Sequence, residues 1–250
     1  KGQVESEAEK IWDIIERFYG TFGFALKARL SLHDPKHPEK FLGTPKVWEE
    51  TESILRGIAI KKKSRFSEAV GEAAFYGPKI DFLAKDSLGR EWQVATIQLD
   101  MNQPERFDLT CVSEDGKPER IFMIHAAIMG AIERFMALLI EHTAGAFPLW
   151  LAPVQVRILA VSDKFQGYAE KITDVLKTKN IRAELTNSNE TLGKRIRAAE
   201  TEKIPHTIVV GEKEVNSKTV NTRNNRTNQQ EEIKLESLIE QISREIARRE

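Results

Sequence analysis

The segment AFPLWLAPVQV, residues 146–156, separates two parts of the chain that have different patterns. Proline fixes φ and has no backbone N–H, so Pro148 and Pro153 interrupt any regular helix or strand that reaches this segment. Before it, strand patterns follow one another, whereas after it strands and helices alternate. We therefore expect two domains, residues 1–150 and residues 151–250, each of ordinary domain size.

The first part has the pattern of a mostly antiparallel sheet. Two segments alternate apolar and polar residues, KIDFLAKD at 79–86 and EWQVATIQLD at 91–100, and a turn at 87–89 joins them. This spacing predicts an antiparallel hairpin. Residues 25–32 alternate in the same way, and FDLTCVS at 107–113 predicts a third strand after the hairpin.

Helical patterns flank these strands. Apolar residues recur every three or four positions over residues 6–22, and a second helical pattern begins at Val47. The segment IFMIH, residues 121–125, predicts a strand that leads into a helix over residues 126–145. Helices packed on a mostly antiparallel sheet make an α+β domain.

The second part alternates strand and helix regularly. The expected strands are residues 154–162, 181–185, 205–211 and 218–223, and the expected helices are residues 165–180, 190–203 and 231–249. Such alternation predicts a parallel or mixed sheet with helices on both faces. The second part is therefore expected to be an α/β domain.

Composition and charge exclude several kinds of protein. The chain has 38 basic and 38 acidic residues and no net charge, so any contact with RNA must come from local patches. The single cysteine, Cys111, excludes an intramolecular disulfide and a metal site made of several cysteines. The start of the chain is charged, and no apolar run approaches the roughly 20 residues of a membrane span. We expect a cytoplasmic protein without membrane association.

Two polar side chains interrupt the apolar segment FMIHAAIMGAIERF, residues 122–135. His125 ends an expected strand, where it is either a metal ligand or a structural histidine. Arg134 lies in an expected helix, and a buried unpaired charge is costly, so an inward arginine needs a partner. That partner is an anionic ligand, which the guanidinium binds in a bidentate manner, or a structural ion pair.

Other polar residues lie near the expected hairpin. Tyr76 and Lys79 flank a Gly-Pro turn that either directs both side chains into a cleft or is an ordinary surface turn. Thr96 and Gln98 share one face of their strand, and Gln93 lies on the opposite face unless a bulge intervenes. Buried neutral polar groups need hydrogen-bond partners, which here are a small polar substrate or neighbouring side chains.

Several segments together resemble the second half of a bacterial-type threonyl-tRNA synthetase, a class II aminoacyl-tRNA synthetase. In the first part these are EAAFYGPKIDF, EWQVATIQLD, PERFDLT, MIHAAIMGAIERF and AGAFPLWLAPVQV, in matching order and spacing. NETLGKRIR, IPHTIVVGEKEV and TVNTR continue the resemblance into an anticodon-binding domain. The prolyl and glycyl enzymes have the same type of anticodon domain, but TIQLD and MIH argue against them. The resemblance implies an incomplete class II antiparallel sheet with helices, followed by an α/β anticodon-binding domain with a mixed sheet.

The resemblance also implies roles for the polar residues of the first part. Arg134 would bind the ATP phosphates and the adenylate, and Lys79 would lie near the reacting carboxylate and the α-phosphate. Tyr76 would belong to the active-site turn. The residues implied to line the adenosine and threonine pockets are Gln93, Thr96 and Gln98. His125 would be one of three protein ligands of a Zn²⁺ ion that binds the amino and hydroxyl groups of threonine.

The implied reaction is ATP-dependent activation of threonine, with Mg²⁺ on the leaving pyrophosphate, followed by transfer of threonine to tRNA(Thr). In the second part the residues implied to bind the anticodon stem and loop are Asn189, Lys194, Arg197, Glu214 and Arg223. Glu214 and Arg223 would read anticodon bases, which suits a single-stranded loop. Without the resemblance, these exposed residues would be interpreted as solvated surface.

The chain departs from the family pattern at several positions. Val94 stands where the family usually has a cysteine. Ala126 stands where the family commonly has an arginine, so this chain lacks a positive charge beside the expected active site. The stretch NTRNNRTNQQEE, residues 221–232, is less basic than the family segment, so we expect weaker binding of the anticodon loop. His33 and His37 lie in a loop that is variable in the family and are not expected to replace missing zinc ligands.

The family's motif 1, motif 2 and remaining zinc ligands normally precede the point where this sequence begins. We therefore expect this sequence to be part of a threonine–tRNA ligase. The partial chain is expected to be inactive by itself, and the full-length enzyme is expected to be a homodimer. The alternative is a non-catalytic tRNA-binding paralogue or remnant. With one zinc ligand, a tight zinc site is not expected in this chain alone.

Overall fold

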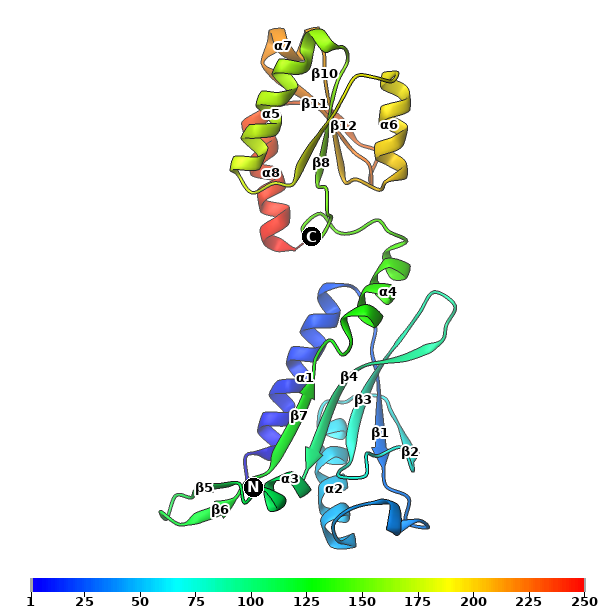
Figure 1. Ribbon diagram of the computed structural model, residues 1–250, viewed down its shortest axis with the longest axis vertical. Helices are drawn as coiled ribbons and strands as arrows, with labels where there is room; N and C mark the ends of the chain where they lie inside the picture. Colours follow the sequence, from blue (N-terminus) through cyan, green and yellow to red (C-terminus); the bar gives the residue numbers. More distant parts are fainter. Residues whose placement is uncertain (1, 250) are drawn as a thin grey trace. The chain divides into compact units, whose positions relative to one another are not determined.

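The chain forms two compact units, Lys1–His142 and Thr143–Glu250, in a computed structural model that describes residues 2–249 (Figure 1). Each unit contains a five-stranded sheet. In both units, apolar residues of the sheet are buried against helices of the same unit. Across residues 2–249, every helix is too short or too polar to span a lipid bilayer.

The sheet of the first unit is mostly antiparallel, as predicted. Its strand order is β2-β1-β3-β4-β7, and only β1 and β2 run parallel. The strands are β1 (Lys27–Leu32), β2 (Phe66–Val70), β3 (Lys79–Lys85), β4 (Glu91–Asp100) and β7 (Met123–Ala127). The predicted hairpin corresponds to β3 and β4. The edge strand β2 was not predicted, because its five residues are half-buried or exposed and lack a strong apolar alternation.

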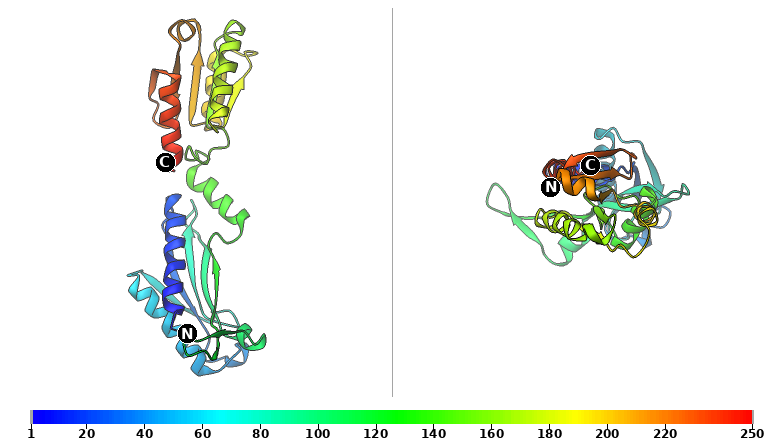
Figure 2. Two further views of the ribbon diagram at one scale, coloured as in Figure 1. Left: turned by 90° about the vertical axis from the view of Figure 1, so that its left-hand side faces the viewer. Right: turned by 90° about the horizontal axis from the view of Figure 1, so that it is seen from above.

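Two helices cover one face of this sheet, α1 (Val4–Thr21) and α2 (Pro45–Lys61), as Figure 2 shows. The buried residues of α1 recur every three or four positions and form one stripe, namely Val4, Ala8, Trp12, Ile15 and Tyr19. Trp12 packs edge-on against Phe82 of β3, with ring centroids 4.7 Å apart. Alternate residues of a strand face opposite sides of the sheet. Burial of the apolar residues of β3 and β4 under the helices therefore directs the polar residues of these strands to the other face.

Two predictions for the end of the first unit were wrong in detail. The expected third strand contains β5 (Thr110–Val112), which follows the short helix α3 (Asn102–Arg106) and pairs with β6 (Pro118–Arg120) in a separate hairpin. The expected helix from residue 126 begins later, because Ala126 and Ala127 extend β7. Gly130 has φ +67°, a left-handed conformation that ends the extended segment, and α4 (Ile132–Thr143) follows.

The second unit has the mixed sheet that the alternating pattern predicts. Its order is β12-β11-β10-β8-β9, with β8 parallel to β9 and β10, and with β11 and β12 antiparallel to their neighbours. The strands are β8 (Val156–Ala160), β9 (Ala183–Thr186), β10 (His206–Val210), β11 (Thr219–Asn224) and β12 (Gln230–Lys234). Strand β12 occupies the start of the expected last helix, because residues 230–234 pair with β11 across a tight turn.

Helices cover both faces of this second sheet, with α5 and α8 on one side and α6 on the other (Figure 1). The helices are α5 (Gln166–Thr178), α6 (Leu192–Thr201), α7 (Glu212–Ser217) and α8 (Leu235–Arg248); short 3-10 turns lie at Pro38–Lys40 (η1) and Asp163–Phe165 (η2). Val156, Ile158 and Ala160 of β8 are fully buried in the core between the sheet, α5 and α8.

Candidate functional site

The uncovered face of the first sheet carries a regular array of polar side chains. In the register of the sheet, Lys79 of β3 pairs with Ser31 of β1 and with Gln98 of β4, and Gln98 pairs with His125 of β7. Directly paired residues of antiparallel strands project from the same face. The topology therefore brings together residues that are far apart in the sequence, in a row across four strands.

Asp81 is the centre of a second row on the same face. It pairs with Arg29 and with Thr96, and its side chain is fully buried. The hydrogen bonds to its carboxylate come from Ser31 Oγ (2.8 Å), Gln93 Nε2 (2.7 Å), Thr96 Oγ1 (3.1 Å) and Arg29 Nη2 (3.2 Å), and Lys79 Nζ also donates to it. A buried carboxylate is tolerated when such donors replace water.

Asp81 was not among the predicted site residues, although the sequence carries one signal of its role. In KIDFLAKD it shares the parity of Lys79 and is the one charged residue between Ile80 and Ala84. A carboxylate at such a position is buried only with partners, so it indicates a polar cluster on that face.

A β-bulge at Val94 moves Gln93 to this polar face. Phe82 pairs with Ala95 and Leu83 with Gln93, which leaves Val94 as an extra residue in β4. Simple alternation predicted that Gln93 and Thr96 lie on different faces of β4. Because of the bulge, both residues lie on the same face. As a result Gln93 Nε2 donates to Thr96 Oγ1 at 2.8 Å as well as to Asp81.

The predicted Tyr76 turn packs against the end of β4. Tyr76 Oη donates to Gln98 Oε1 at 3.0 Å, and Asn102 Nδ2 donates to the Tyr76 carbonyl at 2.8 Å. Gly77 is required here, since a Cβ at this position would lie 1.7 Å from the Leu99 carbonyl oxygen. The turn therefore holds Tyr76 and Gln98 together on the polar face.

His125 contacts a carboxylate rather than a set of metal ligands. Its Nε2 lies 3.0 Å from Oδ2 of the fully buried Asp100, whose other oxygen accepts the backbone N–H groups of Asn102 and Gln103. The Tyr76 ring lies edge-on to the imidazole, with centroids 5.9 Å apart.

The described residues do not by themselves fit a zinc ion. Over residues 2–249 there is no group of three His, Cys, Asp or Glu side chains that could hold a metal. His33 bonds to Glu52 at 2.7 Å and His37 to Glu39 at 3.3 Å, so both imidazoles have local partners. A protein zinc site needs about three such ligands, so His125 would need ligands from outside this part of the chain.

Arg134 is exposed and lies beside Trp92 at the end of the β3–β4 hairpin, so the prediction of an inward arginine was wrong. The helix α4 begins only at Ile132, which places Arg134 in its first turn, on the solvent side. Its Nη1 donates to the Gln93 carbonyl at 2.9 Å, and its guanidinium lies 5.7 Å from the centre of the Trp92 ring. These contacts join Arg134 to the network around Asp81 through Gln93.

The turn of the β3–β4 hairpin holds Trp92 in place beneath Arg134. Asp86 Oδ2 accepts hydrogen bonds from Trp92 Nε1 at 2.9 Å and from Arg90 Nε at 2.6 Å. The Trp92 bond is the main cause that lowers the pKa of Asp86 to about 2, and Arg90 adds to it. A pocket of about 320 Å³ lies beside these residues, lined by Trp92, Arg134 and the first turns of α4.

In the second unit, three of the predicted residues lie near the start of α6. Asn189, Lys194 and Arg197 are exposed, and Lys194 forms an ion pair with Glu190. Their position agrees with the prediction of an accessible surface. An exposed helix start with two basic residues can contact a phosphate backbone.

Glu214 and Arg223 are held more firmly than an exposed surface would require. Glu214 is only 8% exposed, and its Oε2 accepts the Gly211 N–H at 2.9 Å at the start of α7, so its expected exposure was wrong. Arg223 is half-buried and donates to Glu200 Oε1 of α6 at 2.9 Å and to Asn228 at 3.1 Å. The Glu200 contact links Arg223 to the helix that carries Lys194 and Arg197.

Comparison with known families assigns both units. Residues 1–143 match the tRNA synthetase class II core domain (G, H, P, S and T), and residues 155–245 match the anticodon binding domain. The first match covers more than half of the chain. The chain therefore belongs to the class II tRNA synthetase core family.

Similar relatives within that family include threonine–tRNA ligases. The enzyme of Chlorobium phaeobacteroides (strain BS1) is 44% identical over 235 residues, which are 94% of this chain and 36% of that protein. The enzyme of Gloeobacter violaceus is 48% identical over 223 residues, 88% of this chain and 35% of that protein. The predicted resemblance to threonyl-tRNA synthetases is confirmed, and this chain spans about a third of the length of these relatives.

A solved structure agrees with these relatives. The RNA binding domain of threonyl-tRNA synthetase from Cryptosporidium parvum Iowa II superimposes with a TM-score of 0.91 at 34% identity. The match covers 98% of this chain and 61% of that chain. The predicted fold, a partial class II sheet followed by an anticodon-binding domain, is confirmed.

Proposed function

We propose that the chain acts as the C-terminal part of a threonine–tRNA ligase. Residues 1–150 would bind ATP and threonine, and residues 151–250 would bind tRNA(Thr). The observation that carries this proposal is the polar face of the first sheet, where Lys79, Gln93 and Thr96 meet at Asp81 and Arg134 joins them through Gln93. The similarity to threonine–tRNA ligases supplies the substrate.

In this proposal the basic residues stabilise charge during activation of threonine. A carboxylate oxygen of threonine attacks the α-phosphorus of ATP, and the bond to the leaving pyrophosphate breaks. Lys79, fixed by the buried Asp81, and Arg134, fixed by the Gln93 carbonyl, are preorganised donors for the negative charge that develops on the phosphate oxygens. Bound Mg²⁺ would neutralise charge on the pyrophosphate.

Gln98, Tyr76 and His125 would orient the amino acid. They form one contiguous set of hydrogen-bonding groups beside the Asp81 network. A site that must satisfy buried polar groups rejects an analogue that lacks the matching hydroxyl. In a longer protein that supplies two more ligands, His125 would complete a zinc site; this chain's own residues support no step through zinc.

The second unit would hold the anticodon stem and loop. Asn189, Lys194 and Arg197 offer exposed donors at the start of α6, and Arg223 is tied to the same helix. Arg223 and Glu214 are our proposed readers of anticodon bases. The full-length enzyme is proposed to be a homodimer.

The test is threonine-dependent exchange of pyrophosphate into ATP by the full gene product. We expect exchange with threonine and little exchange with valine. The 250-residue chain alone is expected to bind tRNA(Thr) without exchange. Absence of exchange by a folded full gene product would contradict the proposal.

A second candidate is a non-catalytic tRNA-binding protein. It is favoured by one observation, that residues 155–245 match an anticodon binding domain, which binds tRNA without activating an amino acid. A full gene product that binds tRNA(Thr) but does not exchange pyrophosphate in the presence of threonine would select this candidate.

A further inference from the structure

Tyr19 of α1 is buried between the bulge of β4 and the start of α4. Its side chain is 1% exposed, and its hydroxyl donates to the Val94 carbonyl at 2.9 Å. The Met129 carbonyl, in the turn before α4, lies 3.4 Å from the same hydroxyl. Val94 is the extra residue that makes the bulge, so the bond fixes the backbone at the point where the register of β4 changes.

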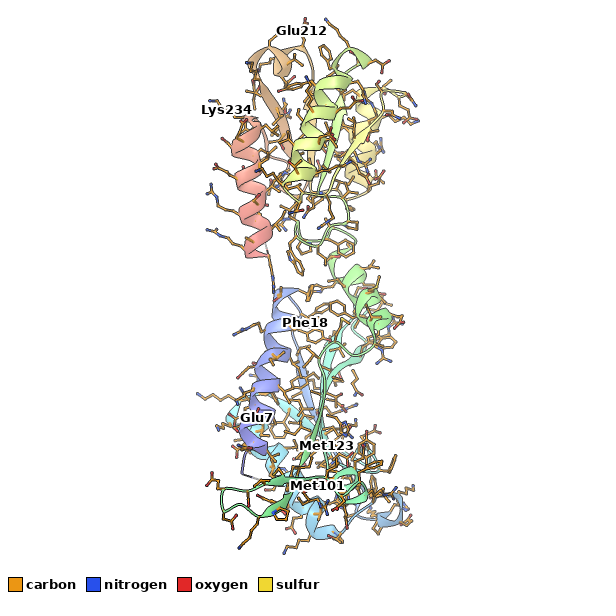
Figure 3. The ribbon with its side chains drawn as sticks, turned by 60° about the vertical axis from the view of Figure 1, so that its left-hand side comes forward. Glu7, Phe18, Met101, Met123, Glu212 and Lys234 are labelled. Atoms are coloured by element: carbon orange, nitrogen blue, oxygen red, sulfur yellow. The ribbon has the colours of Figure 1, made fainter. Side chains whose placement is uncertain are left out.

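The ring of Tyr19 also contacts the helix that carries Arg134. It lies edge-on to Phe135, with centroids 6.2 Å apart, and Phe135 is the residue after Arg134. Phe18, labelled in Figure 3, and Phe22 pack on the same Phe135 ring at 5.3 Å and 5.1 Å. The C-terminal end of α1 therefore anchors the first turn of α4.

Gly130 restricts the Val94 carbonyl as well. A Cβ at Gly130 would lie 2.8 Å from the Val94 oxygen, so the turn before α4 approaches the bulge as closely as a backbone without a side chain allows. The carbonyl of Val94 is thus bounded by the Tyr19 hydroxyl and by the turn. Its position determines that of Gln93, the preceding residue.

Gln93 transmits this geometry to the site in two directions. Its side chain reaches Asp81 and Thr96 only because the bulge turns it to the polar face. Its carbonyl accepts the bond from Arg134 Nη1. The Tyr19 hydroxyl is connected to Arg134 through Val94 and Gln93. It therefore supports both the side-chain contacts of Gln93 and the bond that its carbonyl accepts from Arg134.

We propose that Tyr19 is a positioning residue for Arg134, acting through the bulge at Val94 and the carbonyl of Gln93. The assignment of Arg134 to ATP rests on the proposed function, whereas the structural coupling does not. Burial raises the pKa of Tyr19 well above its usual range, so the hydroxyl remains a donor at any physiological pH. If Tyr19 were only a core aromatic, phenylalanine would replace it without effect on Arg134.

The kinetic test uses Tyr19→Phe in the full gene product. Loss of one neutral hydrogen bond is expected to raise the KM for ATP about five-fold and to leave the KM for threonine unchanged. The matched control is Tyr168→Phe, which removes a tyrosine hydroxyl that donates to a backbone carbonyl, that of Thr219, in the second unit. The control is expected to leave both constants unchanged.

The structural test uses NMR on the 250-residue chain and does not depend on activity. The guanidinium of Arg134 lies over the Trp92 ring, so the ring current should shift its Nε–H resonance. In Tyr19→Phe we expect this resonance to move toward its random-coil position, and in Tyr168→Phe we expect it to stay. A Tyr19→Phe spectrum with an unchanged Arg134 resonance would overturn the proposal.

The two tests separate failure of this proposal from failure of the proposed function. If the full gene product shows no exchange, the function fails and the NMR result still decides the coupling. If Tyr19→Phe does not fold, Gly130→Ala displaces the same Val94 carbonyl from the side of the turn and should shift the Arg134 resonance in the same way. No shift in a folded Gly130→Ala chain would equally overturn the proposal.

Discussion

At the scale of single residues, the buried carboxylate of Asp81 organises the candidate site. It is fully buried, whereas the side chains of its two cationic partners, Arg29 and Lys79, are 27% and 15% exposed. Removing one charge of a buried ion pair leaves the opposite charge without a partner. The resulting loss of folding free energy is larger than the net contribution of the intact pair. The charge on Asp81 therefore stabilises the fold as well as the orientation of Lys79 and Gln93.

We predict that Asp81→Asn lowers the free energy of unfolding by about 3 kcal/mol, the size typical of breaking a buried ion pair. Urea unfolding of the 250-residue chain measures this. The matched control is Asp108→Asn, because Asp108 pairs with Arg120 at the surface and is 87% exposed. Little change is expected there. Equal effects of the two substitutions would argue against Asp81 as the centre of the network.

Strand residues were predictable from the sequence, whereas residues at helix starts were not. Strand parity and cross-strand register place four predicted residues on one face, namely Lys79, Thr96, Gln98 and His125. Tyr76 joins them through its hydrogen bond to Gln98. The environments of Arg134 and Glu214 were predicted wrongly. Arg134 is exposed because α4 starts late, and Glu214 is buried because it satisfies the Gly211 N–H. Both environments depend on where a helix begins, α4 for Arg134 and α7 for Glu214. The residue pattern did not predict either of these helix starts.

At the scale of elements, the long alternating strands were predictable, whereas the exposed edge strands β2 and β12 were not. The β3–β4 hairpin and the β8 and β10 strands have a strong pattern of buried residues. In contrast, β2 and β12 lie at sheet edges and have mostly exposed or half-buried residues, so their pairing depends on a neighbour and not on their own sequence. The bulge at Val94 is likewise a tertiary feature, fixed by Tyr19 and Gly130.

The turn of the β3–β4 hairpin should make stability depend on pH in the acid range. The pKa of Asp86 is lowered from 3.8 to about 2 in the folded chain. A lowered folded pKa means that its contribution is present above pH 4 and is lost as the pH falls toward 2. We predict that Asp86→Asn lowers the Tm at pH 6 and that the difference from the unsubstituted chain narrows between pH 4 and pH 2. A difference that stays constant over this range would contradict the assignment.

At the scale of the whole molecule, each unit brings a different kind of surface to the proposed function. The first unit provides a sheet with one apolar face under α1 and α2 and one polar face, and the second provides an α/β domain with exposed basic residues at the start of α6. The chain spans about a third of its threonine–tRNA ligase relatives. A complete activation site is therefore expected only where further protein supplements the polar face.

Metal content tests this expectation. We predict that the 250-residue chain retains no stoichiometric zinc after dialysis, because residues 2–249 provide no group of three metal ligands. The full gene product is expected to retain one zinc ion per chain and to lose it in His125→Ala. Elemental analysis measures both. One tightly bound zinc ion in the 250-residue chain would show that our ligand assignment is wrong.

Pyrophosphate exchange by Arg134→Ala in the full gene product tests whether the polar face of the first sheet and Arg134 form the ATP and threonine site. Because Arg134 would stabilise charge in the transition state, we predict a loss of about 10²-fold or more in the threonine-dependent rate. Arg17→Ala is the control, since Arg17 is exposed on α1, which packs on the opposite face of the sheet. An Arg134→Ala enzyme that exchanges as fast as Arg17→Ala would contradict the claim.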